Sequence, residues 1–148
     1  SDVSWFNSIG MGNPYKRACA ICHSVHMTGS DISPGVMDIG VNNVATQVTG
    51  APKLPVFKVT CSEDSPPHPY LGREILTTDP GYALISGKCI DVGSLVMQQM
   101  RGLSARAPYF SNGSAKNLAE VVEFYDKRFN MQMTDQEKAD LVNFMSVL

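Results

Sequence analysis

A single pentapeptide near the start of the chain, Cys19-Ala20-Ile21-Cys22-His23, limits the chemistry of this protein more than any other feature. Two thiols at this spacing can each add across a vinyl group of a porphyrin, while the imidazole that follows reaches the iron. The motif predicts one covalently bound haem c, with Cys19 and Cys22 as its anchors and His23 as the proximal iron ligand. We expect the second ring nitrogen of His23 to donate to a backbone carbonyl, which fixes the tautomer.

C-x-x-C alone also occurs in thiol redox proteins and in zinc sites. A zinc site needs a second ligand pair, but the remaining cysteines, Cys61 and Cys89, stand far apart and neither begins another such pair. A thioredoxin-like site needs a buried strand before the motif, and residues 13–18 (NPYKRA) lack the composition of one. The haem interpretation is the one that uses the His directly after the second Cys.

Length, charge and composition restrict the class of protein further. A chain of 148 residues with 43% hydrophobic residues suits a single domain, 1–148, with an ordinary core. The net charge of −2 and the lack of a Lys/Arg-rich run argue against nucleic acid and against an electrostatic membrane anchor. No apolar run approaches the roughly 18 residues of a spanning helix. Because the chain begins at Ser1, we expect a mature product or an excised domain.

Covalent haem attachment generally takes place outside the cytoplasm, so we expect a periplasmic or otherwise extracytoplasmic location. Cysteines there are oxidised where geometry allows, which predicts a disulfide between Cys61 and Cys89. The alternative is a pair of unrelated buried thiols.

Apolar periodicity predicts helices at both ends of the chain. A short helix is expected around Trp5, Phe6 and Ile9, and a helical turn over residues 81–86. A longer helix is expected to begin at Ser114 as N-cap, and one face of it carries Leu118, Val121, Val122, Tyr125 and Phe129. Thr134 and Glu137 form a capping box for a last helix. Residues 26–69 are rich in Gly and Pro and read as loop, with one short strand at residues 56–60.

The C-terminal third resembles a known family. Residues 101–114 (RGLSARAPYFSNGS) and 120–126 (EVVEFYD) are similar to the second haem domain of bacterial di-haem cytochrome c peroxidases and their MauG-like relatives. Residues 77–81 and 38–40 resemble other segments of that family. The resemblance implies a class I cytochrome c fold, and with the two helices it predicts a mainly all-α, cytochrome c-like domain with long irregular loops around the haem.

The resemblance also implies candidates for the remaining haem contacts. In the family the distal ligand comes from the helix after the A-P-Y-F string, as Met in typical peroxidases or Tyr in MauG-like enzymes, and an ungapped alignment puts Tyr125 there. Tyr125 could instead pack in the core. Met131 and Met133 are the thioether alternatives, since class I cytochromes commonly place this ligand before the last helix. Arg101 and Arg106 resemble the arginines near the haem propionates, although a surface role is equally plain.

Other features depart from the family or compete as ligands. The chain has one C-x-x-C-H where the enzymes carry two haem domains, and Ser111 stands where the family usually has His. His26 lies too close to His23 to reach the distal side. His68, in a Pro-rich loop, is either a ligand or a solvated loop histidine.

A single haem motif favours a monohaem electron-transfer protein, either a carrier or a subunit of a redox complex, with redox proteins as its partners. One alternative is the relay-haem fragment of a di-haem peroxidase or MauG-like oxidase whose other haem domain lies elsewhere. Another is a self-contained, peroxide-reactive haem protein. As an enzyme it would be a peroxidase-like oxidoreductase, and no catalytic residue is assigned. A closed six-coordinate iron favours electron transfer, whereas an open position permits peroxide chemistry.

Overall fold

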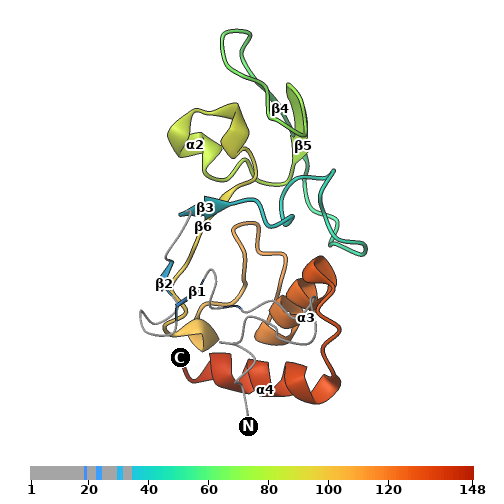
Figure 1. Cartoon of the computed structure of the whole chain (residues 1–148), viewed down its shortest axis with the longest axis vertical. Coiled ribbons are helices and arrows are strands. Elements are labelled where there is room, and N and C mark those ends of the chain that lie inside the picture. The colour runs from blue at the N-terminus through green and yellow to red at the C-terminus, as the bar shows by residue number, and fades with distance from the viewer. Residues whose placement is uncertain (1–18, 20–22, 25–29, 32–34) are drawn as a thin grey trace. The chain divides into compact units, whose positions relative to one another are not determined.

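The computed structural model describes residues 19, 23–24, 30–31 and 35–148. The chain divides into two compact units (Figure 1). Unit 1 consists of Met97–Tyr109 and Ala115–Leu148 together with the chain up to Gly35, and unit 2 consists of Val36–Val96 and Phe110–Ser114. The helix predicted around Trp5 lies outside the described residues.

The elements of each unit are short. Unit 2 holds β3 (Val36–Met37), β4 (Phe57–Thr60), β5 (Glu74–Thr77), α2 (Ala83–Ser86), a 3-10 turn (Cys89–Asp91) and β6 (Leu95–Val96). Unit 1 holds β1 (His23–Ser24), β2 (Ser30–Asp31), a 3-10 turn (Leu103–Ala105), α3 (Leu118–Phe129) and α4 (Asp135–Ser146). Each strand pairs antiparallel with one other, as β1 with β2, β3 with β6 and β4 with β5.

The prediction of a mainly all-α domain is wrong. In the described part of the chain, three α-helices stand beside these antiparallel strand pairs, so the fold is mixed α and β with modest helical content. Apart from β4, the strands could not be predicted from the sequence because they are two to four residues long. Runs of that length show no alternating pattern that distinguishes them from loop.

The β4–β5 pair is the longest of these ladders. Its register sets Phe57 opposite Thr77 and Thr60 opposite Glu74. The strand expected at residues 56–60 is therefore confirmed as β4, while its partner β5 was not foreseen. Along β5, Ile75 and Thr77 are buried whereas Glu74 and Leu76 are exposed, which gives the strand one inward face.

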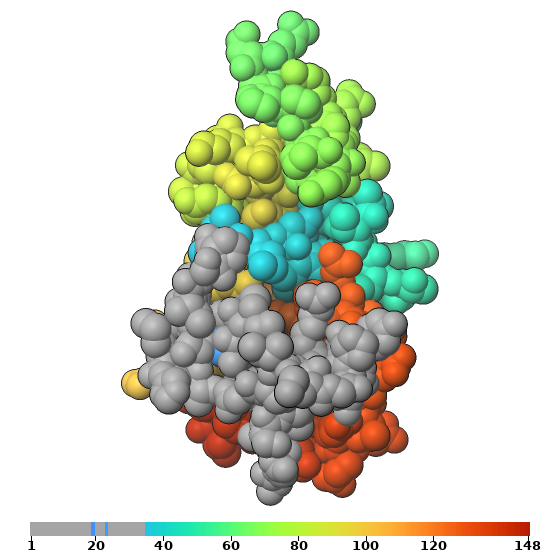
Figure 2. Space-filling view, in the orientation of Figure 1, coloured from blue at the N-terminus to red at the C-terminus, as the bar shows by residue number. Residues whose placement is uncertain are grey.

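The predicted disulfide is present and joins this ladder to the 3-10 turn. Cys61 directly follows β4, Cys89 opens the turn, and their Cα atoms are 5.6 Å apart, within the normal range. Both cysteines are buried in a small apolar cluster with Ile75 and Val92. Figure 2 shows one face of the molecule, on which α2 and most of the segment between β4 and β5 lie at the surface, although Cys61 and His68 of that segment are buried.

Unit 2 also has a polar core. Asn42 and Asn43 are fully buried. The Asn43 amide donates to Asp38 Oδ2 at 3.0 Å and to the carbonyl of Val92 at 2.9 Å. The Asn43 side chain packs closely on Gly93, since a Cβ added to Gly93 would lie 2.3 Å from Asn43 Nδ2. Gly93 also has a φ of 84°. Only glycine fits this position.

The helices of unit 1 begin with two different caps. α3 begins three residues later than expected, because its N-cap is Asn117 rather than Ser114, and Asn117 Oδ1 accepts the N–H of Glu120 at 2.9 Å. The backbone N–H of Ser114 instead donates to Asn112 Oδ1. The capping box of α4 is confirmed, with Thr134 and Glu137 each accepting the backbone N–H of the other.

The core of unit 1 lies between α3 and α4, which run side by side (Figure 1). The buried residues that form it, here named the methionine cluster, are Leu118, Val122, Met131, Met133, Leu141 and Met145. Two of the six, Met131 and Met133, come from the loop between the helices rather than from a helix face. The apolar stripe predicted on α3 therefore supplies only part of this core, and the loop and α4 supply the rest.

Candidate haem site

The structure describes two of the three residues of the C-x-x-C-H motif that are predicted to bind haem. Cys19 is half-buried and packs against the methionine cluster. His23 is half-buried in β1, opposite Asp31 of β2. Cys22 lies outside the described residues. One of the two predicted thioether anchors thus lies against the core of unit 1.

The distal-ligand candidates belong to the same cluster. Met131 is 4% exposed and Met133 8% exposed, so both thioethers are inside the protein. Tyr125 is half-buried at the edge of the cluster, where its ring stacks on Phe129 with centroids 5.9 Å apart and meets Phe124 edge-on at 5.4 Å. Cys19 and Tyr125 therefore pack against the cluster that contains Met131.

The loop that carries the methionines has an unusual backbone. Asn130 ends α3 in the left-handed region with a φ of 48°, and Gln132 follows with a φ of 54°. Asparagine tolerates this conformation, but for glutamine it is uncommon and costs free energy. Between them, the N–H of Met131 donates to the carbonyl of Asp126 at 3.0 Å. A hydrogen bond to the end of α3 thus helps to hold the loop in this backbone conformation.

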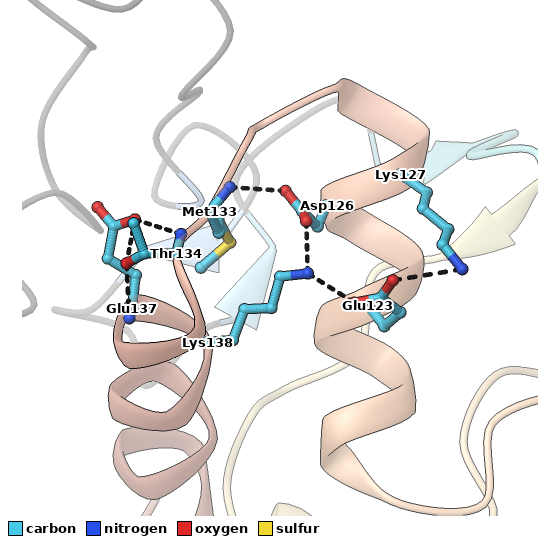
Figure 3. A network of polar contacts seen from close by, with 7 residues as sticks. All are labelled: Glu123, Asp126, Lys127, Met133, Thr134, Glu137 and Lys138. Carbon is cyan, nitrogen blue, oxygen red and sulfur yellow. Dashed lines mark hydrogen bonds and ion pairs between the residues drawn. The ribbon is translucent and has the colours of Figure 1, made fainter.

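Two residues of this site, Asp126 and Lys138, were not foreseen (Figure 3). Asp126 Oδ1 accepts the backbone N–H of Met133 at 3.0 Å. Its Oδ2 pairs with Lys138 Nζ at 2.7 Å, and Lys138 also reaches Glu123 at 2.7 Å. The signal available in the sequence was weak, because acidic and basic residues at these positions also suit a solvated helix face.

The charged groups of this network shift one another's pKa values. Burial raises the pKa of Asp126, but the hydrogen bonds from Lys138 and from the backbone of Met133 outweigh it and lower the pKa below the ordinary value. Hydrogen bonds from Lys138 and Lys127 lower the pKa of Glu123. The two carboxylates in turn raise the pKa of Lys138 well above its usual range. All three groups are therefore charged at neutral pH.

The two arginines lie at the surface. Arg101 is exposed in a turn, and Arg106 is exposed with its Nη1 donating to the carbonyl of Gln99 at 2.8 Å. Tyr109, from the same string, donates through its hydroxyl to the carbonyl of Leu103 at 2.6 Å and so closes the 3-10 turn. A role for Arg101 and Arg106 at haem propionates remains a prediction.

His68 is not a solvated loop histidine. It is 8% exposed, and its Nδ1 accepts the backbone N–H groups of Tyr70 at 3.3 Å and Leu71 at 3.1 Å. Burial lowers its pKa from the ordinary value, partly offset by the charge of Asp38. This imidazole holds a turn of unit 2. His26 lies outside the described residues.

The described residues contain no group of three or more His, Cys, Asp or Glu side chains placed to hold a metal ion. None of the helices in this part of the chain is long and apolar enough to cross a membrane.

The residues near the cluster suit a haem in chemical type. Cys19 offers a thiol, which can add across a vinyl group of haem, and it lies against an apolar cluster. The buried thioether sulfur of Met131 and the phenol oxygen of Tyr125 are donor types that coordinate haem iron. Comparison with protein-family profiles, curated proteins and solved structures finds no match for this chain.

Proposed function

We propose that this protein is a monohaem c-type cytochrome that transfers electrons, either as a carrier or as a subunit of a redox complex. The observation that carries the proposal is the position of Cys19. The first cysteine of the C-x-x-C-H motif packs on the cluster that buries Met131. A thiol that anchors a porphyrin has to lie beside an apolar core that can cover the ring.

Each residue of the site has a defined part in this proposal. Cys19 and Cys22 would hold the haem through thioether bonds, and His23 would bind its iron. Met131 or Tyr125 would supply a second donor to the iron, and Arg101 and Arg106 would pair with the propionates. When bound, the haem supplies one-electron oxidation and reduction at its iron.

Burial of the candidate donors favours electron transfer over reaction with small molecules. Met131 is buried in the methionine cluster, and a donor enclosed there would keep small molecules away from the iron. The Cys61–Cys89 disulfide supports an extracytoplasmic location, because such bonds persist in oxidising compartments. We therefore propose a periplasmic or otherwise extracytoplasmic protein with redox proteins as its partners.

Production of the whole chain in a host that attaches haem c tests the proposal. The intact mass should show one haem that survives acid and organic solvent, and Cys19→Ala with Cys22→Ala should abolish it. The matched control replaces the other two cysteines, Cys61→Ala with Cys89→Ala, and should keep the haem. A wild-type chain without covalent haem would overturn the proposal.

The absorption spectrum then separates electron transfer from peroxide chemistry. An electron carrier should show sharp α and β bands when reduced, typical of low-spin iron with two axial donors. A broad high-spin spectrum that shifts when cyanide or peroxide is added would contradict electron transfer and favour a peroxide-reactive protein.

A further inference from the structure

Asp126 contacts the loop between α3 and α4 at both of its methionines. Its backbone carbonyl accepts the N–H of Met131 at 3.0 Å, and its side-chain Oδ1 accepts the N–H of Met133 at 3.0 Å (Figure 3). One residue thus holds both ends of the segment Met131–Met133. The carbonyl contact would be available to any residue, but the side-chain contact requires a short acceptor, which aspartate provides.

We propose that Asp126, held by Lys138, is a positioning residue that fixes Met131 as the distal donor to the haem iron. This inference rests on the function proposed above and adds a residue that never touches the cofactor. The left-handed backbone of Gln132 makes such support necessary. A residue with a φ of 54° costs free energy and persists only where its neighbours hold it.

Lys138 holds the carboxylate from the neighbouring helix. Asp126 and Lys138 are 13% and 25% exposed at their side chains, whereas Glu123 and Lys127, farther out in the same network, are 44% and 56% exposed. Charge-assisted hydrogen bonds away from solvent are stronger than screened surface pairs. The inner pair is therefore the one that fixes the loop, and the outer pair provides a matched control.

A purely structural role predicts a different result from a positioning role. If the network only joins α3 to α4, its loss lowers stability and leaves the iron's coordination unchanged. If it positions Met131, its loss loosens the bond between sulfur and iron even in molecules that remain folded. The spectrum of the oxidised protein, in which thioether ligation gives a weak band near the red end of the visible range, distinguishes the two.

The test compares Asp126→Asn, Lys138→Gln and the control Lys127→Gln in the haem-loaded whole chain. For the first two we expect a weakened thioether band and an affinity for added imidazole about tenfold higher, because each variant removes the charge-assisted hydrogen bond between Lys138 and Asp126 that holds the acceptor of the Met133 N–H. Exchange of the Met133 amide hydrogen should accelerate by a similar factor. Lys127→Gln should change none of these. Far-UV circular dichroism checks folding, and Lys138→Gln serves if Asp126→Asn does not fold.

Three outcomes overturn the inference, and they are distinguishable. A wild-type chain without covalent haem removes the proposed function and this inference with it. A haem-loaded wild type without a thioether band removes the inference and leaves the proposed function standing. Asp126→Asn and Lys138→Gln variants with an unchanged band and unchanged imidazole affinity assign the network to stability alone.

Discussion

Lys138 of α4 lies 2.7 Å from the carboxylate of Asp126 on α3, and the other oxygen of that carboxylate accepts the backbone N–H of Met133. This relationship joins the two helices and the loop between them. The same loop places two methionines in the core of unit 1. One ion pair therefore links both helices to the loop that carries the candidate donor Met131.

Replacing Lys138 with Met should lower the free energy of unfolding by about 1–2 kcal/mol, because it leaves Asp126 partly buried without its cation. Urea denaturation of the haem-loaded protein measures the change. Lys127→Met removes only an exposed pair with Glu123 at 3.3 Å and should change stability by no more than about 0.5 kcal/mol. Equal effects of the two substitutions would contradict the special role of the inner pair.

The distal donor can be assigned by substitution. Met131→Leu should abolish the thioether band of the oxidised protein, since leucine keeps the volume of the buried side chain but has no sulfur. Met133→Leu, at an equally buried position of the same loop, should keep the band. Tyr125→Phe should leave the spectrum unchanged. A spectrum that changes in Tyr125→Phe and not in Met131→Leu would assign the iron to the phenolate instead.

Stability should depend on pH through His68. Burial holds the folded-state pKa of His68 below its ordinary value of 6.5, so the unfolded chain binds its proton more readily. The stability contribution is therefore complete above about pH 6.5 and is lost as the pH falls toward the folded pKa. His68→Asn keeps an acceptor for the N–H groups of Tyr70 and Leu71 but cannot titrate, so urea denaturation at a series of pH values should show a smaller slope for this variant below neutral pH.

Gly93→Ala should destabilise unit 2 by at least about 2 kcal/mol, since the added methyl would meet the buried amide of Asn43. Gly50→Ala is a matched control, because Gly50 has the same φ of 84° and nothing within 4 Å of the position of its Cβ. The control should cost about 1 kcal/mol from backbone strain alone. Thermal denaturation of both variants isolates the cost of the contact, and equal losses would show that Asn43 moves aside freely.

Removing the disulfide should cost about 3 kcal/mol, because the bond closes a loop over a separation of 28 residues in the unfolded chain. The pair Cys61→Ala and Cys89→Ala should accordingly melt at a lower temperature than the wild type under non-reducing conditions. Titration of the denatured, unreduced wild type with a thiol reagent gives an independent check. Thiols that react at Cys61 and Cys89 would rule the bond out.

Part of the candidate site could be read from local patterns. Cys19 and His23 were named from a five-residue motif, and Met131 from its place before the last helix. Asp126 could not be found this way, because its importance depends on Lys138 in another helix and on the path of the loop between them. The burial of His68 was also missed, since a Gly- and Pro-rich sequence gives no sign of which of its side chains turn inward.

The sequence alone determined the features that depend on close neighbours. These are the C-x-x-C-H motif, the α4 capping box of Thr134 and Glu137, and the apolar stripe of α3. The Cys61–Cys89 bond spans a separation of 28 residues and could be predicted only because the chain has no other cysteines outside the motif. Tertiary structure decided that β4 finds its partner in β5 and that Asp126 holds the methionine loop. Such contacts join segments whose approach depends on intervening turns, and very short strands or single ion pairs leave no periodic signal in the sequence.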